Sequence, residues 1–255
     1  MTEKPTLTKE EQITFITKWI YKIFGESFKY DFDLGFSEED LYVNGERAGA
    51  CVGWNHVKKR YYIDISSLAT KQILMHELGH IYLEHKLGFD SMRMKKSPKG
   101  NVEILLFINS FLDCFTDYNL VLDFPEYYPE FVKGIDNDLQ YLVTPETPFF
   151  DSLLFYLQFY LQLNFILNYQ DKITRINNIK QVLKQERKAI IEKSNGKLCY
   201  QNIQQWDKQL DKFREIKDTK NFKLFFSFIW DTLVLLKLWS KSYLKEQLNL
   251  FLVLK

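Results

Sequence analysis

The sequence predicts an α+β fold that is predominantly α, in which a small antiparallel sheet packs on a helix pair and a helical C-terminal region follows. Strand-like segments are confined to residues 28–66. All six prolines lie at or before Pro148, and nine of the ten glycines lie at or before Gly134. Nearly uninterrupted helix is therefore expected beyond Pro148. We expect two domains, residues 1–148 and 149–255.

The composition is that of a folded chain with no strong charge bias. Of its 255 residues 46% are hydrophobic and 26% are charged, which excludes disorder and supports a sizeable core. The net charge of +1 gives no reason to expect a nucleic-acid partner. Cys51, Cys114 and Cys199 form no CxxC pair, so neither a disulfide framework nor a cysteine-based zinc site is predicted.

Two segments bear on localisation. The first dozen residues are polar and contain no apolar targeting segment, so a cytoplasmic, soluble protein is expected. Residues 152–170 carry no charge but contain five Gln or Asn residues, which are costly in hydrocarbon. We interpret this segment as a buried helix, so no membrane span is expected.

The N-terminal elements follow from local signals. Thr8 and Glu11 fit a capping box, apolar residues follow at helical spacing, and Gly25 would end the helix. Residues 42–43 and 50–52 are strand-like, with Asn44-Gly45 as a turn. Residues 60–65 are the strongest predicted strand.

Helices account for most of the remaining chain. Ser66 and Ser67 are candidate caps for a helix over residues 68–86, and a second helix is expected over about 101–122. Residues 124–148 are predicted to be irregular. About four helices should follow, with a turn at residues 194–196.

The chemistry is concentrated in the segment His76-Glu77-Leu78-Gly79-His80, an H-E-x-x-H motif. On a helix, His76 and His80 project from one face and can share one Zn²⁺. Glu77 lies beside His76 and can take a proton from a water that the metal activates. His85 lies about 180° around the helix from His76, and Glu84 lies about 12 Å along the axis from it. Neither can complete the site.

A third ligand is expected from the next helix. Asn109, Asp113 and Asp117 lie four residues apart on one stripe of an otherwise apolar helix. A carboxylate in such a setting usually has a cationic or metal partner. One of the two acids would bind the metal, and the other would hold a histidine ring through its second nitrogen.

These motifs resemble the zincin metallopeptidases, most closely the gluzincin type that includes thermolysin-like, minigluzincin and ImmA/IrrE-like enzymes. The resemblance covers about residues 41–122 and marks residues 1–148 as a zincin-like metallopeptidase domain. It implies that Asp113 is the third ligand and that Asp117 supports a zinc histidine. Most of these families use Glu as the third ligand, so Asp113 is a departure that requires closer helices. Glu103, 23 residues after His80, is the runner-up.

The resemblance also implies how a substrate would lie. In zincins a strand beside the cleft pairs with the substrate backbone. The resemblance implies that residues 60–65 or 49–53 form this strand. Tyr127, Tyr128 and His56 are candidate donors to an oxyanion. Cys51 is interpreted as a structural cysteine rather than a metal ligand.

The sequence thus predicts a zinc-dependent peptidase with one Zn²⁺ ion held by His76, His80 and Asp113 and with Glu77 as the general base. Its partner would be a peptide or protein substrate. The alternative is a non-catalytic or latent zincin-fold module whose helical C-terminal region mediates partner contacts or self-association. A site closed to solvent would favour that alternative.

Overall fold

The computed structural model describes residues 7–25, 32–37, 41–43, 46–87, 102–140, 147–169, 171–213 and 222–238. Within these ranges the chain is mostly helical with a small sheet, which confirms the predicted fold class. It divides into two compact units, Met1–Met94 with Asn119–Phe131 and Lys95–Tyr118 with Val132–Lys255. The expected domain boundary at residue 148 stays a prediction.

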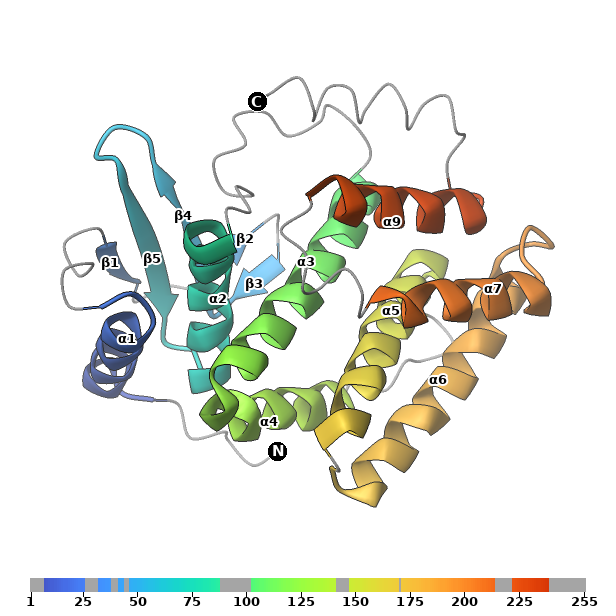
Figure 1. Cartoon of the computed structure of the whole chain (residues 1–255), viewed down its shortest axis with the longest axis horizontal. Coiled ribbons are helices and arrows are strands. Elements are labelled where there is room, and N and C mark those ends of the chain that lie inside the picture. The colour runs from blue at the N-terminus through green and yellow to red at the C-terminus, as the bar shows by residue number, and fades with distance from the viewer. Residues whose placement is uncertain are drawn as a thin grey trace. The chain divides into compact units, whose positions relative to one another are not determined.

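The sheet of the first unit has three strands in the order β1-β5-β4 (Figure 1). Strand β5 (Arg60–Ser66) is central and pairs antiparallel with β4 (Ala50–Asn55) and parallel with β1 (Phe32–Ser37). The sheet is therefore mixed, because β1 joins it through a long-range parallel pairing. Strands β2 (Leu41–Val43) and β3 (Glu46–Ala48) form a separate antiparallel pair.

Helix α1 (Lys9–Phe24) begins and ends where the sequence predicts. Both hydrogen bonds of the Thr8–Glu11 capping box are present, and Gly25 ends the helix with a positive φ of 88°. Gln12 is buried, and its side-chain amide donates to the carbonyls of Ser66 at 3.1 Å and Ala69 at 3.3 Å. This side chain fixes α1 against the connection that leads into the next helix.

Helix α2 (Lys71–Leu87) begins later than the predicted cap at Ser66 or Ser67. The Ser66 hydroxyl accepts from the backbone N–H of Leu68 at 3.2 Å and donates to the Gly49 carbonyl at 2.9 Å, so it stabilises a turn. Thr70 takes the capping role, because its hydroxyl accepts from the N–H of Ile73 at 3.3 Å. The expectation was wrong because the serine supports the strand end instead.

Helix α3 (Val102–Asp123) agrees with the prediction, whereas the segment after it does not. Residues 124–148 were expected to be irregular, but they contain a short 3-10 helix, η2 (Pro125–Tyr127), and helix α4 (Tyr128–Asp138). Pro129 does not prevent this helix. It occupies the first turn of α4, where the missing N–H has no intrahelical partner to lose.

The second unit has a core built from helices. Helix α5 (Phe149–Ile166) packs against α6 (Ile173–Lys193), with the short 3-10 helix η3 (Leu167–Tyr169) between them in sequence. Helices α7 (Tyr200–Asp211) and α9 (Phe222–Leu235) contact one another (Figure 1). The turn after α6 has positive φ at Asn195 and Gly196, as predicted. Among the described residues no helix is long and apolar enough to cross a membrane.

Candidate metal centre

Helix α2 is largely buried, and the motif lies on a partly accessible stripe of it. Six of its apolar residues are at most 1% exposed: Leu74, Met75, Leu78, Ile81, Tyr82 and Leu83. His76, Glu77 and His80 are half-buried. The polar side chains of the motif therefore share the part of the helix that is not covered by the core.

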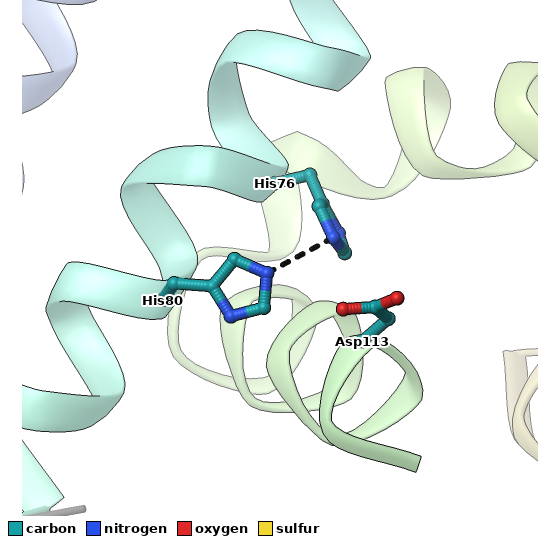
Figure 2. Close-up of side chains that lie close together, drawn as sticks. All are labelled: His76, His80 and Asp113. Atoms are coloured by element: carbon teal, nitrogen blue, oxygen red, sulfur yellow. Dashed lines mark hydrogen bonds between the residues drawn. The ribbon is translucent and has the colours of Figure 1, made fainter. Parts of the chain in front are cut away.

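The two histidine rings converge at one point. Their Nε2 atoms lie 3.2 Å apart, and the ring planes are nearly perpendicular at 86° (Figure 2). Two ligands of a tetrahedral zinc ion at about 2.0–2.1 Å would be separated by about 3.3 Å. The same separation suits a hydrogen bond between two neutral imidazoles. The Nε2–Nε2 distance is therefore compatible both with two ligands of a tetrahedral site and with a direct hydrogen bond.

Asp113 of α3 supplies the third side chain of the group (Figure 2). One ligand atom from each of His76, His80 and Asp113 lies within 4.8 Å of the others. The three side chains together could hold a metal ion.

A contact that the sequence did not reveal joins α2 to the end of α3. Asp123, at the end of α3, accepts a hydrogen bond from the Tyr82 hydroxyl of α2. The Tyr82 ring also packs edge-to-face on Phe124 at 5.6 Å. These two contacts hold the last turn of α3 against α2. Neither Tyr82 nor Asp123 carries a local sequence signal for this pairing.

The donor set fits zinc. Two imidazole nitrogens and one carboxylate oxygen occur in zinc sites that keep a fourth position for water or substrate. Imidazole and carboxylate ligands also accept other divalent ions, so the three side chains alone do not identify the metal.

Glu77, Asp117 and Glu103 are the other residues that the sequence predicts for the site. Glu77 lies on the accessible stripe of α2, adjacent to His76. Asp117 lies one turn beyond Asp113 on α3 and is half-buried, but it is not part of the three-residue group. Its support of a histidine stays a prediction. The side chain of Glu103 lies outside the described residues.

Two residues excluded as ligands have other roles. The His85 ring packs edge-to-face on Phe24 of α1 at 5.7 Å, in agreement with its predicted direction away from the site. Glu84 was expected to be a surface group or a support of the metal ligands. It is instead only 6% exposed and accepts a hydrogen bond from the Tyr61 hydroxyl at 3.0 Å. Glu84 thus joins α2 to strand β5.

Helix α2, which carries Glu77, packs against strand β4. Burial raises the pKa of the Cys51 thiol, and the negative charges of Asp64 and Glu77 raise this pKa further. The thiol is therefore protonated at neutral pH and is a poor metal ligand in that form. On α3, burial and the neighbouring Asp113 and Asp117 likewise hold the pKa of the Cys114 thiol well above its usual range.

Of the candidate oxyanion donors, Tyr127 is engaged elsewhere. It is 1% exposed, and its hydroxyl donates to the Gln72 carbonyl of α2 at 3.3 Å. This bond fixes η2 against the first turn of α2. His56 lies exposed in the turn between β4 and β5, and Tyr128 is half-buried.

Comparison with known proteins gives no match: no family model fits the chain, and no curated protein or solved structure resembles it closely enough to match. The resemblance to zincins therefore depends on the motif residues and on the geometry of the three side chains.

Proposed function

We propose that this protein is a zinc-dependent peptidase. The observation that carries the proposal is the convergence of the His76 and His80 Nε2 atoms, 3.2 Å apart, with a carboxylate oxygen of Asp113. Glu77 is adjacent on the same accessible stripe, where a general base is needed. Metal ligands and a base in this relation are the minimum that metal-assisted hydrolysis requires.

The proposed chemistry assigns a role to each side chain. His76, His80 and Asp113 would hold the ion, which when bound lowers the pKa of water towards neutrality and polarises a carbonyl. Glu77 takes the proton from the water that attacks the peptide carbonyl carbon. As the C–N bond breaks, Glu77 gives this proton to the leaving amine nitrogen, so one carboxylate serves both halves of the reaction.

The sheet offers a place for a peptide backbone. Strand β5 is paired on both sides, whereas β4 is at the edge of the three-stranded sheet. Of the two strands that the resemblance suggested, only β4 can therefore add a substrate strand along its edge. The negative charge of Glu77 contributes to the raised pKa of the Cys51 thiol on this strand. A peptide along β4 would lie close to the proposed base.

Metal content and peptide cleavage test the proposal together. The purified full chain is expected to contain about one zinc per chain and to cleave unfolded peptides. Removing the metal with a chelator should abolish cleavage, because the ion supplies the water activation, and adding zinc back should restore it. Elemental analysis and a fluorogenic peptide assay measure the two quantities.

The outcomes separate the two functional hypotheses. Stoichiometric zinc without cleavage of any peptide would contradict the enzymatic proposal and favour the non-catalytic module. Absence of zinc binding at neutral pH would contradict both. Cleavage that survives complete removal of metal would show that the activity comes from another source.

A further inference from the structure

A groove in the helical unit is formed by α5, α6 and the first residue of α7, and it has a volume of about 770 Å³. Its apolar lining includes Leu163 of α5 and Leu183 of α6, which are 9% and 7% exposed, and the half-buried Ile191 of α6. Lysines of α6 lie along it as well: Lys180, Lys184 and Lys188. The groove therefore combines an aliphatic surface with a row of positive charges.

The charge of the groove is of one sign. Its lining contains four Lys or Arg side chains and, among the described residues, no Asp or Glu. Lys180, Lys184 and Lys188 are four residues apart, so they form one stripe along α6. Like charges at this spacing repel and destabilise a helix. Lys188 has an exposed ion pair with Glu192 at 3.6 Å, but no described acidic side chain pairs with Lys180 or Lys184. An acidic ligand would relieve this repulsion.

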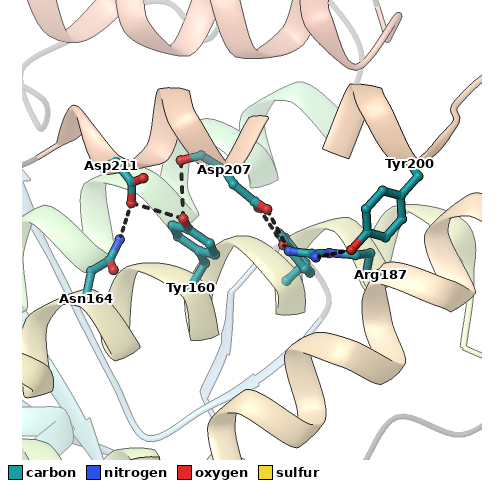
Figure 3. A network of polar contacts seen from close by, with 7 residues as sticks. Tyr160, Asn164, Arg187, Tyr200, Asp207 and Asp211 are labelled. Carbon is teal, nitrogen blue, oxygen red and sulfur yellow. Dashed lines mark hydrogen bonds and ion pairs between the residues drawn. The ribbon is translucent and has the colours of Figure 1, made fainter. Parts of the chain in front are cut away.

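One wall of the groove is fixed by a polar network (Figure 3). The Arg187 guanidinium contacts the Asp207 carboxylate at 2.6 Å and donates to the hydroxyls of Tyr156 at 2.8 Å and Tyr200 at 3.1 Å. The Tyr160 hydroxyl donates to the Asp211 carboxylate at 3.0 Å. Because Arg187 is already neutralised by Asp207, its role is to hold the wall. A wall held in place before binding loses little entropy when a ligand docks.

The aromatic faces distinguish between two kinds of anionic ligand. Single-stranded nucleic acid binds basic grooves by stacking its bases on exposed rings. Here the Arg187 guanidinium lies over one face of the Tyr200 ring at 5.4 Å, which leaves Tyr200 52% exposed, and the Tyr160 ring stacks with Tyr156 at 5.9 Å. The aliphatic side chains suit apolar side chains of a peptide better than bases. The glutamines Gln181 and Gln185, also in the lining, can hydrogen-bond a peptide backbone.

We propose that this groove binds an acidic, amphipathic peptide segment of a partner protein. Leu163, Leu183 and Ile191 receive the apolar side chains of the segment, and the lysine stripe receives its carboxylates. The inference is independent of the metal centre, because its residues and its test involve binding alone.

Fluorescence anisotropy with labelled peptides tests the proposal on the full chain. The probe is a peptide of about twelve residues that alternates Glu and Leu, long enough to span the roughly 12 Å between Lys180 and Lys188. It should bind, and the affinity should fall with added salt. Matched peptides of Lys and Leu or of Glu and Ser should bind much more weakly, since each lacks one of the two features.

Charge-reversal variants locate the binding surface. The double variant Lys180→Glu/Lys184→Glu should lower the affinity for the Glu-Leu probe about tenfold or more. The control Lys172→Glu/Lys197→Glu makes the same change in net charge at exposed sites outside the groove and should bind like the wild type. Circular dichroism checks that both variants fold. Failure of the wild type to bind the probe, equal weakening in both variants, or tighter binding of an oligothymidine than of the probe would each overturn the proposal.

Discussion

Replacing Glu77 with glutamine is expected to lower the rate of peptide cleavage by about 10²- to 10⁴-fold while zinc content stays unchanged. Glutamine keeps the size of the side chain but cannot take a proton from water. Glu77 is not one of the three converging side chains, so the variant should retain the metal. Steady-state assays with a fluorogenic peptide and elemental analysis of the same preparation give both values.

The control for this variant makes the same chemical change elsewhere. Glu10 is exposed in the first turn of α1, and Glu10→Gln should cleave like the wild type. Equal cleavage by wild type and Glu77→Gln would exclude Glu77 as the general base. Loss of zinc in Glu77→Gln would instead assign this residue to the metal site itself.

Replacing Asp113 with alanine is expected to lower the affinity for zinc by more than about 100-fold. Losing a residue that only orients a ligand typically costs 10- to 100-fold, and losing the ligand itself should exceed that. Asp117→Ala should lower the zinc affinity by only about 10- to 100-fold if Asp117 supports a histidine ring. Competition titration against a chromophoric chelator measures all of these affinities.

Two further variants make the titration specific for Asp113. Asn109 is exposed one turn before it on α3, and Asn109→Ala should leave the affinity unchanged. Glu103→Ala tests the runner-up ligand in the same way. Wild-type affinity in Asp113→Ala, or a greater loss in Asp117→Ala or Glu103→Ala, would show that another carboxylate completes the site.

Local signals were sufficient for helix α1 and for the two helices that carry the candidate metal ligands. A capping box defined α1, and the four-residue spacing of His76 and His80 placed both rings on one face of α2. The apolar pattern around residues 104–115 predicted α3. Each of these features is set by residues within a few turns of one another, where helical geometry alone determines which side chains meet.

Features that depend on distant contacts were not predictable in the same way. The parallel pairing of β1 with β5 joins segments separated in sequence, and nothing local marks it. Ser66 was expected to cap α2, but its hydroxyl bonds to the Gly49 carbonyl, which only the folded sheet brings near. The Tyr82–Asp123 hydrogen bond likewise joins residues that are 41 positions apart in sequence. The position of Asp113 on its helix face made it a candidate ligand. Its proximity to the two histidines could not be predicted from the sequence.

Diffraction from crystals of the zinc-loaded protein, recorded at the zinc absorption edge, tests the central claim most directly. We predict one strong anomalous peak, with the Nε2 atoms of His76 and His80 at about 2.0–2.1 Å and an Asp113 oxygen at about 2.0–2.2 Å. A zinc-loaded crystal with no peak between these three side chains, or with the ion held by other residues, would contradict it.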